Sequence, residues 1–155
     1  MTTNRSKVKP NIAQFTLDDS FGYLINRTAQ RLKYALQQGF KAKGYDITPE
    51  QWAVLNRLWE EEGLSQVELA DRTFKDKPNI TRMLGVLEKR GLISRQPDDN
   101  DQRMIKVYLT DEGRDLKKKL IPIALKTLEK GGRNLADEDI EHLKRTLNTI
   151  ASNFD

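Results

Sequence analysis

Apolar residues recur every three or four positions through most of this chain, and they alternate with polar residues in one short region. The helical spacing predicts six helices, and the alternation over 92–96 and 103–109 predicts two paired strands. A chain of 155 residues is long enough to bury one sizeable core. We therefore predict a single, mainly α domain with a small β wing.

Capping signals set the boundaries of the first two helices. Thr16 and Asp19 have the spacing of a capping box, and Gly44 is a natural stop, so a first helix is expected between them. The sequence 48–51 (Thr-Pro-Glu-Gln) is a stronger start signal, in which threonine caps and proline takes the first helical position. The second helix is expected to end at Gly63.

The next signals describe a short helix followed by a longer one. Ser65, with Glu68 three positions later, predicts a third helix over Gln66–Arg72. Asp76 can cap a fourth helix that ends at Gly91. A short helix, a brief break, a second helix and two strands form the order of a helix-turn-helix with a wing.

Two more helices complete the chain. Thr110 caps a long fifth helix, in which Pro122 predicts a kink. Gly131 and Gly132 break the chain before a last helix, whose apolar residues alternate spacings of three and four as in a coiled-coil seam.

The start of the fourth helix carries side chains that suit a DNA groove. A recognition helix needs short or basic side chains there, because they must reach base edges without holding the helix away. We expect Asn79 and Arg82 to read bases, since asparagine pairs well with adenine and arginine with guanine. Lys77 and Thr81 suit bases or phosphates equally, and Pro78 adds an apolar contact. Each residue alone could be solvated helix surface, but together on one face they favour DNA.

Residues outside this helix suit the DNA backbone and the minor groove. Ser65 and Gln66 begin the third helix, whose N–H groups favour a phosphate, although Ser65 also fits a capping role alone. Arg95 on the first strand suits a phosphate or is an exposed strand residue. At the tip of the wing, Arg103 can enter a narrow minor groove and Asp101 can hold it there. The alternative for this pair is a local ion pair worth about 0.5 kcal/mol.

Charge and composition agree with this interpretation. The chain has a net charge of +4, and residues 72–106 alone hold nine Lys or Arg against five Asp or Glu. This asymmetry favours one side that faces nucleic acid. The absence of cysteine excludes disulfides, thiolate metal sites and direct thiol sensing. No apolar run matches a membrane span or a secretory signal, so a cytoplasmic location is expected.

No catalytic constellation, cofactor motif or metal site is predicted. The sequence contains one histidine and no glycine-rich phosphate loop. His142 stands near Glu138 and Glu141 on the last helix, but an exposed polar surface is the interpretation we prefer to a metal site.

These motifs resemble those of the MarR family of bacterial transcriptional regulators. The resemblance covers the order of elements along nearly the whole chain and is carried by three motifs: Leu64-Ser65-x2-Glu68-Leu69-Ala70, Leu84-x2-Leu87-Glu88-x2-Gly91-Leu92-Ile93, and Asp101-x-Arg103-x5-Leu109-Thr110 followed by Glu112-Gly113. Ala136 departs from the pattern, because serine or threonine is common at that cap.

The resemblance implies a homodimer that binds a pseudo-palindromic DNA duplex, with Arg103 as the minor-groove arginine. It implies a winged helix-turn-helix lobe over 47–110, dimerisation helices over 16–46 and 111–155, and a flexible N-terminal arm over 1–15. The residues expected at the dimer interface are Leu17, Phe21, Leu24, Leu143, Leu147 and Ile150.

The resemblance also implies a repressor that a small ligand releases from DNA. Many members respond to small phenolic or other anionic aromatic ligands bound between the dimer base and the DNA lobe. Tyr34, Phe40 and Trp52 are candidates for such a pocket, although aromatic residues at helical spacing are more often core. The alternative function is a winged-helix protein-interaction module that does not read DNA, which the cationic recognition face argues against.

Overall fold

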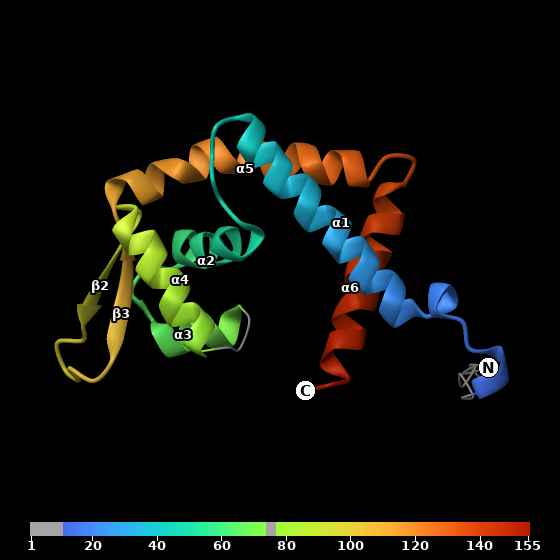
Figure 1. Cartoon of the computed structure of the whole chain (residues 1–155), viewed down its shortest axis with the longest axis horizontal. Helices are drawn as coiled ribbons and strands as arrows, with labels where there is room; N and C mark the ends of the chain where they lie inside the picture. Colours follow the sequence, from blue (N-terminus) through green and yellow to red (C-terminus); the bar gives the residue numbers. More distant parts are fainter. Residues whose placement is uncertain (1–10, 74–76) are drawn as a thin grey trace.

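The computed structural model describes residues 11–73 and 77–155 and contains a winged lobe joined to three long helices (Figure 1). The elements in chain order are the 3-10 helices η1 (Ile12–Gln14) and η2 (Leu17–Asp19), then α1 (Phe21–Ala42), α2 (Pro49–Glu60), β1 (Leu64–Ser65), α3 (Gln66–Arg72), α4 (Lys77–Lys89), β2 (Ile93–Pro97), β3 (Ile105–Leu109), α5 (Asp111–Gly131) and α6 (Asp137–Ser152). The prediction of a mainly α fold with a small β wing is confirmed.

A small antiparallel sheet carries the wing. The strand order is β1-β3-β2, with Leu64 opposite Val107 and Ile93 opposite Leu109. The two-residue strand β1 was not predicted, because two residues are too few to show an alternating pattern. It places the start of α3 directly against β3, so the sheet fixes α3 relative to the wing.

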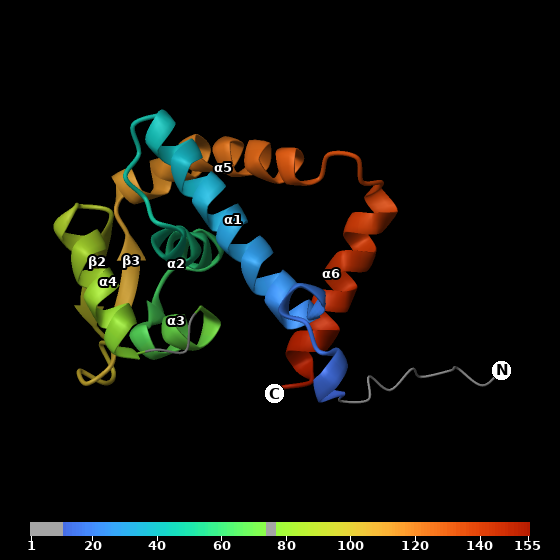
Figure 2. The same ribbon diagram turned by 45° about the vertical axis from the view of Figure 1, so that its right-hand side comes forward.

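The core lies in the lobe and continues along the first half of α5. Its buried side chains come from every helix of the lobe, from the sheet, from the end of α1 and from α5, and include Phe40, Leu55, Leu69, Leu84 and Leu120. Helix α6 contributes no buried residue. Figure 2 shows α1, α5 and α6 as the three sides of a triangle beside the lobe.

Helix capping follows the sequence signals at most positions. Thr48 and Gln51 form the reciprocal capping box of α2, and the Ser65 hydroxyl accepts the Glu68 N–H at 3.0 Å. The prediction at Thr16 is wrong, because its side chain makes no capping hydrogen bond. Residues 17–19 form a separate 3-10 turn instead, and α1 begins only at Phe21.

Glycines end two of the helices by adopting left-handed backbone conformations. Gly44 follows α1 with φ of +86°, and Gly91 follows α4 with φ of +77°. Helix α6 lacks a side-chain cap at Ala136, but the Asp139 carboxylate accepts the Ala136 N–H at 2.8 Å. Pro122 lies inside α5 without ending it. The predicted cap at Asp76 lies outside the described residues.

The start of α5 docks closely on the lobe. The Thr110 hydroxyl accepts the Gly113 N–H at 3.1 Å and donates to the Gly91 carbonyl at 2.6 Å. Gly113 lies so close to the lobe that a Cβ would overlap the carbonyl oxygen of Leu92. The Trp59 indole N–H donates to the Gly113 carbonyl at 2.9 Å. These contacts make α5 a rigid extension of the lobe.

A second attachment joins Glu62, after α2, to Arg114 on α5. The guanidinium donates to both carboxylate oxygens at 3.0 and 2.9 Å, and the Leu109 N–H donates to the same carboxylate at 2.9 Å. These hydrogen bonds, above all those from Arg114, hold the pKa of Glu62 below its usual value.

Removing the Glu62 charge is expected to destabilise the fold at neutral pH and progressively less in acid. Because the folded-state pKa is lowered, ionised Glu62 stabilises the protein above its unfolded-state pKa, and this contribution disappears as pH falls through the folded-state value. Glu62→Gln should therefore lower the free energy of unfolding by about 1 kcal/mol at pH 7. The difference from wild type should shrink towards pH 3 in urea unfolding at one fixed protein concentration. An undiminished difference at pH 3 would show that packing, not charge, is responsible.

Several apolar side chains outside the lobe remain exposed in the single chain. Among the six residues predicted to mediate dimerisation, Phe21 is 60% exposed and Leu143 is 48% exposed. Leu17 and Leu147 are also exposed, whereas Leu24 and Ile150 are half-buried. Several large exposed apolar side chains on α1 and α6 are typical of an interaction site. In the part of the arm that is described, residues 12–14 form η1.

In the described parts of the chain, no helix is both long and apolar enough to cross a membrane.

Candidate nucleic-acid interface

Three elements that could contact DNA lie at one end of the lobe. The start of α4, helix α3 and the tip of the wing share this end, and α5 crosses the opposite end (Figures 1 and 2). Helix α4 buries Ile80, Leu84 and Leu87 against the core, which fixes its rotation about its own axis. Its opposite face therefore remains at the surface.

The exposed face at the start of α4 carries the predicted reading residues. Pro78, Thr81 and Arg82 are exposed, and Asn79 is half-buried. Arg82 Nη2 donates to Asn79 Oδ1 at 2.7 Å, so the two polar groups lie together at the surface. An amide and a guanidinium placed side by side offer donors and an acceptor to base edges. The side chain of Lys77 lies outside the described residues.

The two residues at the start of α3 have different environments. Ser65 is only 2% exposed, and its hydroxyl caps α3, so the structure supports the capping role for this side chain rather than a phosphate contact. Gln66 is half-buried, and its Oε1 accepts from Arg95 Nη1 at 3.4 Å.

Arg95 is enclosed by polar groups from two helices. Its Nη2 donates to Glu88 Oε1 at 3.1 Å, and its backbone N–H donates to Glu88 Oε2 at 2.9 Å. Its side chain is 26% exposed. It passes Gly85, where an added Cβ would lie 3.8 Å from Arg95 Nη2, an ordinary van der Waals contact. The alternative of an exposed strand arginine is therefore wrong, because Arg95 joins β2 to α4 and α3, whereas its phosphate contact stays a prediction.

The charge of Glu88 is stabilised by this arrangement. Hydrogen bonds from the Arg95 side chain and then from its backbone N–H hold the pKa of Glu88 below its usual value. Glu88 was part of a family motif in the sequence but was not singled out as a site residue. Glu88 and Arg95 are seven residues apart, on opposite sides of a turn, so neither the helical period nor the strand period reveals their contact.

Two aspartates organise the wing tip. Asp98 accepts the Asn100 N–H at 2.7 Å and pairs with Lys106 at 3.3 Å, and these contacts, the first above all, lower the pKa of Asp98. Asp98 also raises the pKa of Lys106. The tip therefore has a defined shape before any ligand binds.

Arg103 projects from this ordered tip. Asp101 Oδ1 accepts the Arg103 backbone N–H at 3.1 Å and its Nε at 3.3 Å, as the sequence predicted for this pair. The Arg103 side chain is nevertheless 94% exposed. A guanidinium held at its base and free at its end is suited to enter a narrow groove of negative potential.

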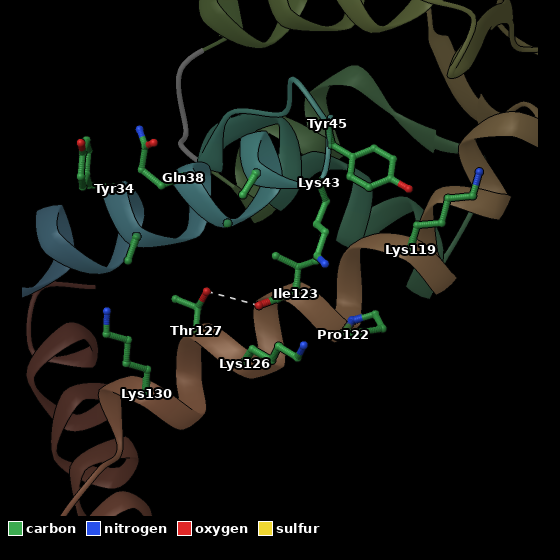
Figure 3. A pocket seen from close by; sticks show the side chains of 13 residues that line it. Tyr34, Gln38, Lys43, Tyr45, Lys119, Pro122, Ile123, Lys126, Thr127 and Lys130 are labelled. Atoms are coloured by element: carbon green, nitrogen blue, oxygen red, sulfur yellow. Dashed lines mark hydrogen bonds between the residues drawn. The ribbon is translucent and has the colours of Figure 1, made fainter.

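The predicted effector residues do not share one pocket. Tyr34 is exposed and lines an open groove between α1 and α5 (Figure 3). Phe40 is fully buried, and its ring centroid lies 5.3 Å from that of Trp52, which packs on the core. Phe40 and Trp52 are thus core aromatics and not part of this groove's lining. Sequence reasoning missed the lysines of the groove, since they look like ordinary solvated helix surface.

No group of three or more potential metal-ligating side chains comes together in residues 11–73 and 77–155. This includes the neighbourhood of His142, which the sequence had offered as a weak alternative.

The winged lobe of this chain is similar to that of known proteins. Residues 47–105 match the family model of the MarR family. The chain is 43% identical over 76 residues to the HTH-type transcriptional regulator TtmR of Methylorubrum extorquens (strain PA1), a match that spans 49% of this chain and 39% of TtmR. It is 33% identical over 105 residues to the organic hydroperoxide resistance transcriptional regulator of Bacillus subtilis (strain 168), covering 68% of this chain and 70% of that protein.

The fold is also similar to that of a solved DNA complex. The transcriptional repressor CouR, in a structure with a 23-mer DNA duplex, superposes with a TM-score of 0.80 at 29% sequence identity, covering 87% of this chain and 94% of CouR. The family model matches the lobe that carries α3, α4 and the wing, and the Bacillus relative extends the match beyond it. This chain therefore belongs to the MarR family of transcriptional regulators.

Proposed function

We propose that this protein is a homodimeric repressor that binds a pseudo-palindromic DNA duplex through its winged lobe. One observation carries the proposal: the start of α4, which holds the Asn79–Arg82 pair, and the tip of the wing, which holds the exposed Arg103, lie at the same end of the lobe. The pair on α4 suits base edges in a major groove, and Arg103 suits the minor groove beside it. Pro78, Thr81 and Lys77 complete the proposed reading surface.

The dimer in this proposal uses the helices outside the lobe. The exposed apolar residues of α1 and α6, with η2, are available to a second copy of the chain, and they lie away from the reading surface (Figure 2). The proposed division is thus residues 47–110 for DNA and residues 16–46 and 111–155 for dimerisation. Two-fold symmetry then places two α4 helices about 34 Å apart, one turn of DNA. We place this activity in the cytoplasm, with the bacterial chromosome, and propose no catalytic role.

Selection of bound fragments from the source genome with the purified protein tests this function. The expected result is a small set of sites with two inverted half-sites, whose positions also identify the regulated genes. Binding to a selected duplex should weaken linearly in a plot of log affinity against log salt. Recovery of random fragments, or a flat salt response, would instead favour the winged-helix protein-interaction module.

The salt dependence also separates two roles for Arg95. A phosphate contact contributes about 0.9 to the salt slope, whereas a residue that only holds the wing in place contributes nothing to it. Because Arg95 is committed to Glu88 and Gln66, we expect Arg95→Gln to weaken binding about tenfold with an unchanged slope. Fluorescence anisotropy between 50 and 300 mM salt measures both quantities. A slope reduced by about one would show that Arg95 contacts a phosphate.

Glu88→Gln provides the companion measurement. It removes the charge that holds Arg95 but retains the guanidinium, so it should weaken binding in the same direction as Arg95→Gln and also leave the slope unchanged.

We propose further that a small ligand releases the repressor from DNA. The support is an open groove with exposed cationic side chains between two helices of the dimerisation region, which is also where Tyr34 lies.

A further inference from the structure

The groove between α1 and α5 has a volume of about 780 Å³. It is lined by α1, by α5, and by Lys43 and Tyr45 after α1, and none of its lining residues comes from the lobe over 47–110. The groove is therefore a different site from any cleft between the dimerisation helices and the winged lobe. Ligand sites typically occupy about 300–1,000 Å³, so the groove can hold an organic molecule larger than a single ring.

The floor of the groove is apolar because small residues of α1 face α5. Ala35, Gly39 and Ala42 lie on α1 opposite Pro122 and Ile123 of α5. The helices approach closely at Gly39, where a Cβ would lie 3.0 Å from Ile123 Cγ2. On either side of this contact the small side chains leave space. The floor therefore suits a hydrocarbon chain or ring.

The rim of the groove is cationic. Lys43, Lys119, Lys126 and Lys130 all line it, and the lining contains no aspartate or glutamate. Figure 3 shows these lysines around the apolar side chains, with Tyr45 near Lys119 and Tyr34 further along α1. None of the four lysines belongs to an ion pair with another described residue, whereas Lys33, Lys106 and Lys144 each do.

We propose that this groove binds an amphiphile with an apolar chain or ring and at least two negative charges, and that this ligand is the effector of the repressor. The regulatory part rests on the proposed function. Four ammonium groups without a carboxylate repel one another, and each added ligand charge relieves that repulsion. A monocarboxylate would neutralise only one of the four ammonium charges, so a phosphate ester or a dicarboxylate fits the site better. The Tyr34 and Tyr45 hydroxyls supply further donors.

The groove connects physically to the DNA lobe. Gly39 in its wall precedes Phe40, which packs on Trp52 of α2 at 5.3 Å between ring centroids. Trp52 packs on Trp59 at 5.6 Å, and Trp59 donates to the Gly113 carbonyl at the start of α5. A ligand that changes the spacing of α1 and α5 must therefore displace α2 or deform this aromatic cluster. Phe40 and Trp52, expected from the sequence to touch the effector, transmit its binding instead.

Calorimetry on the free protein tests the site with three probes of equal chain length. Decanol, decanoate and decyl phosphate carry no charge, one charge and up to two charges, and each is used below its aggregation concentration. The expected order of affinity is decyl phosphate, then decanoate, with decanol weakest. Equal affinity for all three probes, or no binding of any, would overturn the proposed ligand class.

Paired lysine substitutions on α5 locate the binding. A double variant with Lys126→Gln and Lys130→Gln should bind decyl phosphate about tenfold more weakly. Each exposed charge contact accounts for up to about fivefold of this loss of affinity. Lys118→Gln is the matched control, because Lys118 lies on the same helix but does not line the groove. Both proteins should keep the wild-type circular dichroism spectrum. An unchanged affinity in the double variant would show that decyl phosphate binds elsewhere.

A separate measurement tests the regulatory part. Decyl phosphate should release wild-type protein from a selected duplex at concentrations that fill the groove, and the double variant should need about tenfold more. Binding without release would overturn the effector role and retain the site. A protein that binds no duplex would refute the proposed function, while calorimetry would still decide the site.

Discussion

Replacing Arg103 with alanine is expected to weaken binding to a selected duplex about 10- to 100-fold, the effect of a specific arginine contact worth about 1–3 kcal/mol. The side chain is 94% exposed, so the free protein loses almost no packing when it is removed. Asp101 already orients the guanidinium by accepting its Nε at 3.3 Å, and a preorganised contact loses less entropy on binding. The loss should therefore appear in DNA affinity and not in stability.

Fluorescence anisotropy at 150 mM salt, with thermal unfolding measured in parallel, checks this result. Arg133→Ala is the charge-matched control, because Arg133 is exposed in the connection between α5 and α6, away from the lobe. The minor-groove role would be refuted if the two variants bound the duplex equally well. Asp101→Asn should lie between wild type and Arg103→Ala, since it loosens the guanidinium without removing it.

Gly113→Ala is expected to be the most destabilising single methyl addition in the described chain. Its Cβ would overlap the Leu92 carbonyl oxygen and come within 3.2 Å of Leu109 Cδ2. The carbonyl belongs to the backbone and also accepts the Thr110 N–H at 3.0 Å, so it cannot rotate away as a side chain could. We expect a loss of about 3 kcal/mol. The corresponding fall in melting temperature is about 6–12 °C for a chain of this size.

Gly85→Ala serves as the matched control. It adds a methyl group to a glycine inside α4, where the nearest atom would be Arg95 Nη2 at 3.8 Å. Alanine favours the helix over glycine by about 0.5–1 kcal/mol, so this variant should unfold at a slightly higher temperature. Thermal unfolding at one protein concentration compares the two. If Gly113→Ala were no less stable than wild type, α5 could not dock on the lobe as described.

Local signals were sufficient to predict most helix boundaries. Thr48, Ser65 and Thr110 each cap a helix where the sequence indicated, because a capping side chain and its N–H partner lie within three residues. Thr16 failed because the residue spacing of a capping box does not decide whether its hydrogen bond forms, and Thr16 makes none before the 3-10 turn there. The exposed face of α4 was also predictable, since helical periodicity separates it from the buried face, and the DNA-reading role of its residues stays a prediction.

Contacts between distant residues were not predictable. In the sequence Arg95 resembles an exposed strand residue, but the fold places Glu88 and Gln66 beside it, and no periodicity joins a strand to two helices. The groove was missed for a similar reason. Its lysines come from α5 and from the residue that follows α1, and their common location depends on how those helices cross at Gly39 and Ile123. Only the folded chain shows that the charges gather over an apolar floor.

The hydrogen bonds of Arg95 to Glu88 and Gln66 also limit how substitutions or an effector can change the proposed DNA contacts. Because one residue joins β2, α4 and α3, the wing and α4 cannot shift relative to each other without breaking these hydrogen bonds. In the proposed complex, the offset between the minor-groove and major-groove contacts is thus a fixed property of each lobe. Substitutions on α4 would change which bases the proposed repressor reads, but not how far its wing reaches along the duplex. We therefore expect the proposed effector to change the distance or angle between the two lobes of the dimer.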